Sequence, residues 1–209
     1  GYSAGGLSGP VAYQAWIRQV IAGIGSRPAA VVIEPDALAS ASCLSATKKS
    51  QRYAMLKDAT YRLAAQKTTA VYLDAGHSAW LPSREVASRL KLAGVGHARG
   101  FSLNVSNFRR TSEEISYGER ISYLTGGKRY VIDTSRNGLG PATNAAWCNP
   151  SGRALGVKPT AATGGRHADA YLWIKHPGES DGTCGRGEPA AGEWWRDYAI
   201  GLVTRSPYF

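Results

Sequence analysis

The amino-acid sequence predicts an α/β fold with parallel strands, and three features support that prediction. Short apolar runs alternate with segments of helical periodicity. The runs recur roughly every 30–40 residues, which suits strand–helix units joined by loops. They are apolar on both faces, as in strands that helices or a barrel interior cover on each side. With 209 residues, 43% of them hydrophobic, the chain suits one globular domain with a sizeable core.

The helices and strands follow from these patterns in chain order. Apolar runs predict strands at residues 29–33, 69–73, 100–103, 130–132 and 170–174. Helical periodicity predicts helices at residues 16–24, 50–66, 86–93, 111–124 and 194–202. The fourth helix begins with a plausible capping box, Thr111-Ser112-Glu113-Glu114. We expect Trp16, Trp194 and Trp195, which lie at helical spacing, to be core residues, and residues 134–168 to form a long ordered loop.

Polar side chains stand where the predicted strands end, beginning with the stretch VVIEPDALAS. The strand-end residues are Asp36, Asp74, Asn104, Asp133 and Lys175, with Glu179 and Asp181 just beyond the last one. In parallel α/β folds the carboxyl ends of the strands line one face, and active sites lie there. Carboxylates that converge in one cleft have their pKa values split, so that one stays protonated while another is ionised.

Two carboxyl groups on either side of a bond are what glycoside hydrolysis requires. Trp80, Trp147 and Trp173 lie near the strand ends in sequence, and exposed indoles stack on the apolar faces of sugar rings. Together these residues favour a carbohydrate cleft. Clustered aspartates can also hold Mg²⁺ or Ca²⁺, so a metal-dependent hydrolase is an alternative.

The same carboxylates also have purely structural interpretations. Asp36 and Asp74 could each cap a helix N-terminus, and Asp181 could belong to a turn because Gly178 and Gly182 flank it. For Asp133, which is followed by Thr134-Ser135-Arg136, pairing with an arginine is the favoured interpretation.

Composition argues against several other classes of protein. The net charge is +10, but the Lys and Arg residues are scattered, so nucleic-acid binding is not expected. No apolar run reaches about 18 residues, so no membrane span is expected. The three cysteines, Cys43, Cys148 and Cys184, have no histidine at metal-ligand spacing, and there is no dinucleotide fingerprint, P-loop or GxSxG elbow. We therefore expect no cofactor, and these patterns give no reason to expect a metal.

Six short motifs, in order, resemble those of a known family. They are IEPD, YLDAGHSAW, NVSNF, VIDTSRNGLGP, WCNPSGRALG and WIKHPGESDG, and they run from about residue 31 towards the C-terminus. This series is similar to that of glycoside hydrolase family 6, the inverting β-1,4-glucanases that include endoglucanases and cellobiohydrolases. The resemblance implies a distorted, seven-stranded TIM-like barrel.

The resemblance also implies roles for individual residues. Asp36 is similar to the general acid and Asp181 to the general base, while Asp74 resembles the aspartate that orients substrate and tunes the site. The residues implied in substrate binding are Trp80, His77, Asn107, Arg136, Trp147, Lys175 and Glu179.

One departure from the family pattern concerns the start of the chain. Family members carry an Arg-Asp-Cys motif shortly before a loop that resembles GYSAGG, with which this sequence begins. By this resemblance, residues 1–209 are expected to be a single, N-terminally truncated catalytic domain that lacks the first barrel strand. The resemblance pairs Cys148 with Cys184 and leaves Cys43 without its partner.

The sequence and the resemblance together predict a secreted, monomeric endo-β-1,4-glucanase that acts on cellulose, cello-oligosaccharides or mixed-linkage β-glucan with inversion. An open cleft is favoured because the segment from Asp181 to Trp194 is short and no second tryptophan follows Trp80. The alternatives are a cellobiohydrolase of the same family and a catalytically impaired, glucan-binding fragment.

Overall fold

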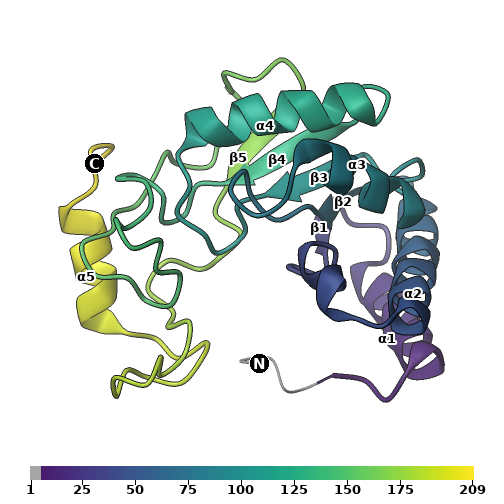
Figure 1. Ribbon diagram of the computed structural model, residues 1–209, viewed down its shortest axis with the longest axis horizontal. Coiled ribbons are helices and arrows are strands. Elements are labelled where there is room, and N and C mark those ends of the chain that lie inside the picture. The colour runs from purple at the N-terminus through teal and green to yellow at the C-terminus, as the bar shows by residue number, and fades with distance from the viewer. Residues whose placement is uncertain (1–5) are drawn as a thin grey trace.

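The computed structural model describes residues 6–209, which form an arched parallel sheet with helices along its outer side (Figure 1). The strands are β1 (Ala29–Ile33), β2 (Thr69–Asp74), β3 (Gly100–Leu103), β4 (Arg129–Asp133) and β5 (Ala168–Leu172). They lie in the order β1-β2-β3-β4-β5, and every neighbouring pair is parallel. The predicted fold class is confirmed: α2, α3 and α4 connect the parallel strands β1 to β4 in turn, the long loop at residues 134–167 leads to β5, and the sheet curves as part of a barrel.

The helices follow the strands in the predicted order. They are α1 (Pro10–Ile24), α2 (Ala46–Ala64), α3 (Ser83–Leu92), α4 (Thr111–Leu124) and α5 (Arg196–Thr204), with a 3₁₀ helix, η1, at Ala39–Cys43. In Figure 1, α1 to α4 follow the outer side of the arc, whereas α5 stands apart at its far end. Between residues 6 and 209, no helix is both long and apolar enough to cross a membrane.

The core lies between the sheet and these outer helices. Leu73, Phe101 and Ile132 of the central strands and Leu90 and Ile121 of the helices are fully buried together. Removing such side chains from water supplies the main stabilisation of the sheet, roughly 1.5–3 kcal/mol for each one.

Close packing of α4 on the sheet depends on one glycine. A Cβ atom on Gly118 would lie 2.7 Å from the ring of Tyr130, so only glycine lets the helix approach β4 this closely. Glycine inside a helix costs about 0.5–1 kcal/mol, which the packing against Tyr130 offsets.

Four local predictions are wrong. Thr111 does not cap α4: Arg110 is the N-cap residue, and the Thr111 hydroxyl accepts a hydrogen bond from Asn137 instead. The terminal helix begins at Arg196, because Trp194 pairs with Glu179 in an antiparallel bridge. The last strand ends at Leu172, two residues early.

The predicted core tryptophans are the fourth correction. Trp16 and Trp194 are 44% and 65% exposed, and Trp195 is only half-buried. Helical spacing indicated a buried stripe, but Trp194 and Trp195 precede α5 and so do not share its buried face.

An ion-pair network ties the amino-terminal ends of the strands together. Asp169 of β5 accepts hydrogen bonds from Tyr72 Oη (2.8 Å), from Arg99 Nε and Nη2 (2.6 and 2.9 Å) and from Arg129 Nε (3.0 Å). Burial alone would raise the pKa of Asp169, but the hydrogen bonds from Arg99 and Tyr72 and the two arginine charges outweigh it and hold that pKa below its usual range. The carboxylate thus links β2, β3, β4 and β5.

Replacing Asp169 with Asn should lower the free energy of unfolding by about 1–2 kcal/mol at pH 7, because charge-assisted hydrogen bonds are lost. A depressed folded-state pKa stabilises the protein above the unfolded pKa of about 3.9, and this contribution is lost as the pH falls through the folded value. Urea unfolding should therefore show the two proteins converging below about pH 4.

Asp58→Asn is the matched control, because Asp58 forms an ion pair with the neighbouring Arg62 on α2, where both side chains are partly exposed. It should change the unfolding free energy by less than about 1 kcal/mol. If Asp169→Asn were as mild as this control at pH 7, the network would not support the sheet.

Candidate active site

The strand ends carry an unusual concentration of strained backbone. Asp36, Asn104, Ser106 and Asn149 all have positive φ angles, of 70°, 65°, 57° and 43°. Residues other than glycine rarely adopt this conformation, and where they do, the surrounding contacts must hold them. All four residues lie beyond the carboxyl ends of the strands, where the sequence places the carboxylates.

Asp36 and Asp74 meet at the ends of β1 and β2. The buried Asp74 carboxylate accepts hydrogen bonds from the backbone N–H groups of Asp36 (2.9 Å) and Gly76 (3.1 Å) and from the Ser102 hydroxyl (3.2 Å). Burial, with a further contribution from the charge of Asp36, raises the pKa of Asp74 to about 7 against the effect of these hydrogen bonds. Partial desolvation also raises the pKa of Asp36 above its usual value, although this residue is exposed.

Asp133 is the central node of the strand ends. Its Oδ2 accepts hydrogen bonds from the N–H groups of Ser106 (2.9 Å) and Lys175 (3.0 Å), and its Oδ1 accepts one from Ser135 N–H (2.9 Å). The carboxylate is completely buried, and this burial raises its pKa while the three N–H groups oppose the change. The predicted pairing of Asp133 with an arginine is wrong, because its carboxylate oxygens accept hydrogen bonds from backbone N–H groups instead.

The arginine expected beside Asp133 binds Asp181. Arg136 is fully buried, and its Nη1 donates to Asp181 Oδ2 at 2.8 Å while its Nη2 donates to the Ser106 carbonyl at 2.5 Å. Its guanidinium also lies 4.5 Å above the centre of the Phe108 ring. A buried arginine whose donors reach both a carboxylate and a carbonyl fixes Asp181 relative to the loop after β3.

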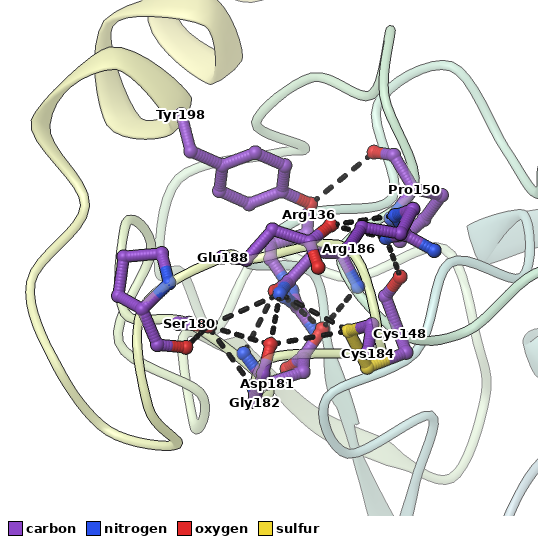
Figure 2. Close-up of a disulfide and its surroundings, with 12 residues drawn as sticks. Arg136, Cys148, Pro150, Ser180, Asp181, Gly182, Cys184, Arg186, Glu188 and Tyr198 are labelled. Atoms are coloured by element: carbon purple, nitrogen blue, oxygen red, sulfur yellow. Dashed lines mark hydrogen bonds and ion pairs between the residues drawn. A yellow bond between two sulfur atoms is a disulfide. The ribbon is translucent and has the colours of Figure 1, made fainter.

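Asn149 clamps Asp181 from the opposite side. Its N–H donates to Asp181 Oδ2 at 3.0 Å, and its side-chain carbonyl accepts from the Asp181 N–H at 2.7 Å. The Asn149 amide also donates to the Gly182 carbonyl at 2.7 Å. Figure 2 shows the Cys148–Cys184 disulfide beside Asp181, and this disulfide joins the loops that carry Asn149 and Asp181. The predicted cysteine pairing is confirmed, and Cys43 is a free thiol.

A continuous set of hydrogen bonds joins the two ends of the site. From Asp74 it passes through Gly76, whose carbonyl accepts from Asn104 N–H at 2.8 Å. The Asn104 amide then donates to the Asp133 carbonyl at 2.9 Å. Asp133 and Arg136 share the loop at Ser106, so the chain of contacts ends on Asp181. This network joins the Asp74, Asp133 and Asp181 carboxylates, and Asp36 is tied to it through its backbone N–H.

The remaining predicted residues divide into two groups around this network. Lys175 Nζ lies 3.7 Å from Glu179 and 3.9 Å from Asp181, so these three form one cluster. The pKa of Glu179 is lowered, mainly by a hydrogen bond from His176. His77 and Trp80 lie together in the loop after β2, with ring centres 5.4 Å apart.

Trp80 and Trp147 are 39% and 48% exposed, as aromatic platforms for a ligand must be. Trp173 is not part of the site: its indole N–H donates to the Val157 carbonyl, and its ring packs near Phe209. The side-chain oxygen of Asn107 accepts the N–H of Phe108 and so shapes its own turn. In the part of the chain that the structure describes, no three His, Cys, Asp or Glu side chains form a metal-binding group.

Sequence reasoning missed Asn149 and Ser106, whose N–H groups bind the carboxylates of the site. Asn149 belongs to the WCNP motif, so its position beside a cysteine was a signal that it lies near Asp181. Ser106 acts through its backbone, which no side-chain pattern reveals.

Comparison with known proteins identifies the family. The pattern of glycosyl hydrolases family 6 matches residues 1–206. The chain belongs to this family. It is 46% identical over 98% of its length to endoglucanase A of Cellulomonas fimi, and 43% identical over 97% to endoglucanase 1 of Streptomyces halstedii. It spans 44% and 64% of those two proteins.

Solved structures of the family share the fold. The endoglucanase Cel6 from Mycobacterium tuberculosis, in complex with methyl-cellobiosyl-4-deoxy-4-thio-β-D-cellobioside, is 58% identical, with a TM-score of 0.95 over 98% of this chain and 70% of that one. The catalytic core of the cellobiohydrolase Cel6A from Chaetomium thermophilum is more distant, at 27% identity and a TM-score of 0.80, with 94% of this chain and 69% of that one covered.

The hydrogen bonds of Asp133 can be tested by substitution. In Asp133→Asn, the new NH₂ group would face an N–H donor, so at least one buried donor would lose its acceptor. We expect the free energy of unfolding in urea to fall by about 2 kcal/mol. Asp197→Asn, on an exposed residue of α5, is the matched control and should have little effect. Equal stability of the two variants would contradict the role of Asp133.

Proposed function

We propose that this chain is an endo-β-1,4-glucanase that cleaves cellulose and related β-glucans with inversion of anomeric configuration. The observation that carries the proposal is the hydrogen-bonded network linking Asp36 to Asp181, two carboxylates that follow the opposite edge strands of one curved sheet. Family membership and the similarity to named endoglucanases support it.

We assign Asp36 as the general acid. Its raised pKa keeps a larger share of the carboxyl protonated, so that it can give its proton to the leaving glycosidic oxygen. The Asp74 carboxylate holds the Asp36 backbone N–H and thereby fixes where the acid stands. Because its own pKa is about 7, Asp74 also changes charge near neutral pH beside that acid.

We assign Asp181 as the general base. Arg136 and Asn149 both bind its Oδ2, which leaves Oδ1, with Lys175 Nζ 3.9 Å away, to accept a proton from the attacking water. Inverting enzymes need their two carboxyl groups about 6.5–9.5 Å apart, with a water between one of them and the sugar. The origin of Asp36 and Asp181 beyond opposite edges of the sheet favours this wider spacing over the shorter one of retaining enzymes.

Substrate binding is assigned to the exposed indoles and the polar residues beside them. Trp80 and Trp147 would stack on glucosyl rings, while Lys175, Glu179 and His77 would contact hydroxyl groups. Arg136 is fully buried and bound to Asp181, so we assign it to holding the base rather than to sugar binding.

Endoglucanase action is preferred over cellobiohydrolase action. Four endoglucanases related in sequence are 42–46% identical to this chain, whereas four related probable cellobiohydrolases are 30–32% identical. We further propose that the protein acts as a secreted monomer, because its substrate is an extracellular polymer and its disulfide suits an oxidising compartment.

Reducing-sugar release from carboxymethyl cellulose tests the assignment of Asp36. Asp36→Asn should lower kcat/KM by about 100-fold or more, because an amide cannot donate the proton that general acid catalysis requires. Asp58→Asn is the surface control and should leave the rate unchanged.

The binding of cellohexaose, measured by calorimetry, separates the possible outcomes. Activity in the unaltered chain that survives Asp36→Asn would contradict the role of Asp36. Binding without any activity in the unaltered chain would contradict the proposed hydrolysis and leave a glucan-binding fragment.

A further inference from the structure

The first turns of α4 reach the loop that carries Trp80. Glu114 is completely buried, and its Oε1 accepts the Ser78 N–H at 2.9 Å. Three residues later on the same helix, the Tyr117 hydroxyl donates to the Leu81 carbonyl at 2.7 Å. Side chains three positions apart share one face of a helix, so this face holds the loop at two points on either side of Trp80.

The loop itself is compact on its inner side. Trp80 N–H donates to the His77 carbonyl at 3.0 Å, and the His77 ring accepts the Ala79 N–H at 3.3 Å. A Cβ atom on Gly76 would lie 3.3 Å from the Trp80 ring, so the indole packs directly on the backbone. The orientation of the indole therefore follows the position of this loop, and Glu114 and Tyr117 hold its outer side.

Burying the ionisable side chain of Glu114 costs free energy. Its second oxygen, Oε2, is buried and has no hydrogen-bond partner between residues 6 and 209. Burial raises the pKa of Glu114 to about 7, opposed by the hydrogen bond to Ser78 and by the charge of Arg109. The hydrogen bond to Ser78 N–H offsets only part of the free energy that this burial costs.

We propose that Glu114 is a positioning residue: through Ser78 it sets the Trp80 platform, and so controls how tightly a glucan chain binds on that side of the cleft. This inference rests on the proposed function. Glu114 is too deeply buried to touch a sugar, so its effect must pass through the loop.

Cellohexaose binding, measured by calorimetry, and hydrolysis of carboxymethyl cellulose test the proposal together. Glu114→Ala should raise the Kd and KM about tenfold and leave kcat within about threefold, because it loosens the platform and leaves the residues assigned to proton transfer in place. Glu114→Gln should restore binding to near the unaltered value, since its amide oxygen can still accept the Ser78 N–H. Glu113→Ala is the control, because Glu113 pairs with Arg109 on the same turn.

A double-mutant cycle with Trp80→Ala makes the test specific. If Glu114 acts through Trp80, then Glu114→Ala should add less than about twofold to the Kd of the Trp80→Ala protein. Fully additive effects, or a loss confined to kcat, would overturn the proposal.

Tyr117→Phe supplies a second variant in case Glu114→Ala does not fold. It removes only the hydroxyl bound to Leu81 and should raise the Kd in the same direction. The double variant that carries both Glu114→Gln and Tyr117→Phe is measured beside it. A Kd that is unchanged in both proteins would count against the proposal. Binding is measured in the Asp36→Asn background, so that cellohexaose is not turned over, and failure of the proposed hydrolysis would appear separately, as missing sugar release by the protein with Asp36.

Discussion

The architecture of the site depends on buried carboxylates that accept the backbone N–H groups of neighbouring loops. Asp74 holds the loops after β1 and β2, and Asp133 holds those after β3, β4 and β5. A buried carboxylate costs free energy unless it is fully hydrogen-bonded, so each of these loops must stay where its N–H group meets the acid. The positive φ angles of Asp36, Asn104 and Ser106 are tolerated because this network holds them.

The two ends of the sheet serve different purposes. At the amino-terminal end, Asp169 and its arginines tie four strands together. At the carboxyl end, Arg136 and Asn149 use comparable bonds to hold Asp181 by one oxygen only. The network around Asp169 thus supports the sheet, whereas the network at the carboxyl end also positions the carboxylates to which we assign the chemistry, as in barrels whose active sites lie at that end.

The order and type of the elements could be predicted because apolar periodicity reflects burial directly. The placement of Asp36, Asp74 and Asp181 at or beyond the carboxyl ends of the strands could be predicted too, since parallel strands end on one face. The hydrogen-bond partners of individual side chains could not be predicted. Asp133 binds backbone N–H groups and not Arg136, and Thr111 bonds to Asn137 rather than capping α4. Those choices depend on distances between loops far apart in sequence, which no local pattern encodes.

The central claim is that Asp36 and Asp181 act from opposite sides of the scissile bond, with water between Asp181 and the sugar. Proton NMR of cellohexaose hydrolysis, recorded before the anomers equilibrate, tests it most directly. The account predicts that the new reducing end appears first as the α-anomer, because water attacks the face opposite the leaving group. Initial appearance of the β-anomer would show retention, and would contradict the assignment of Asp181 as the base that activates water.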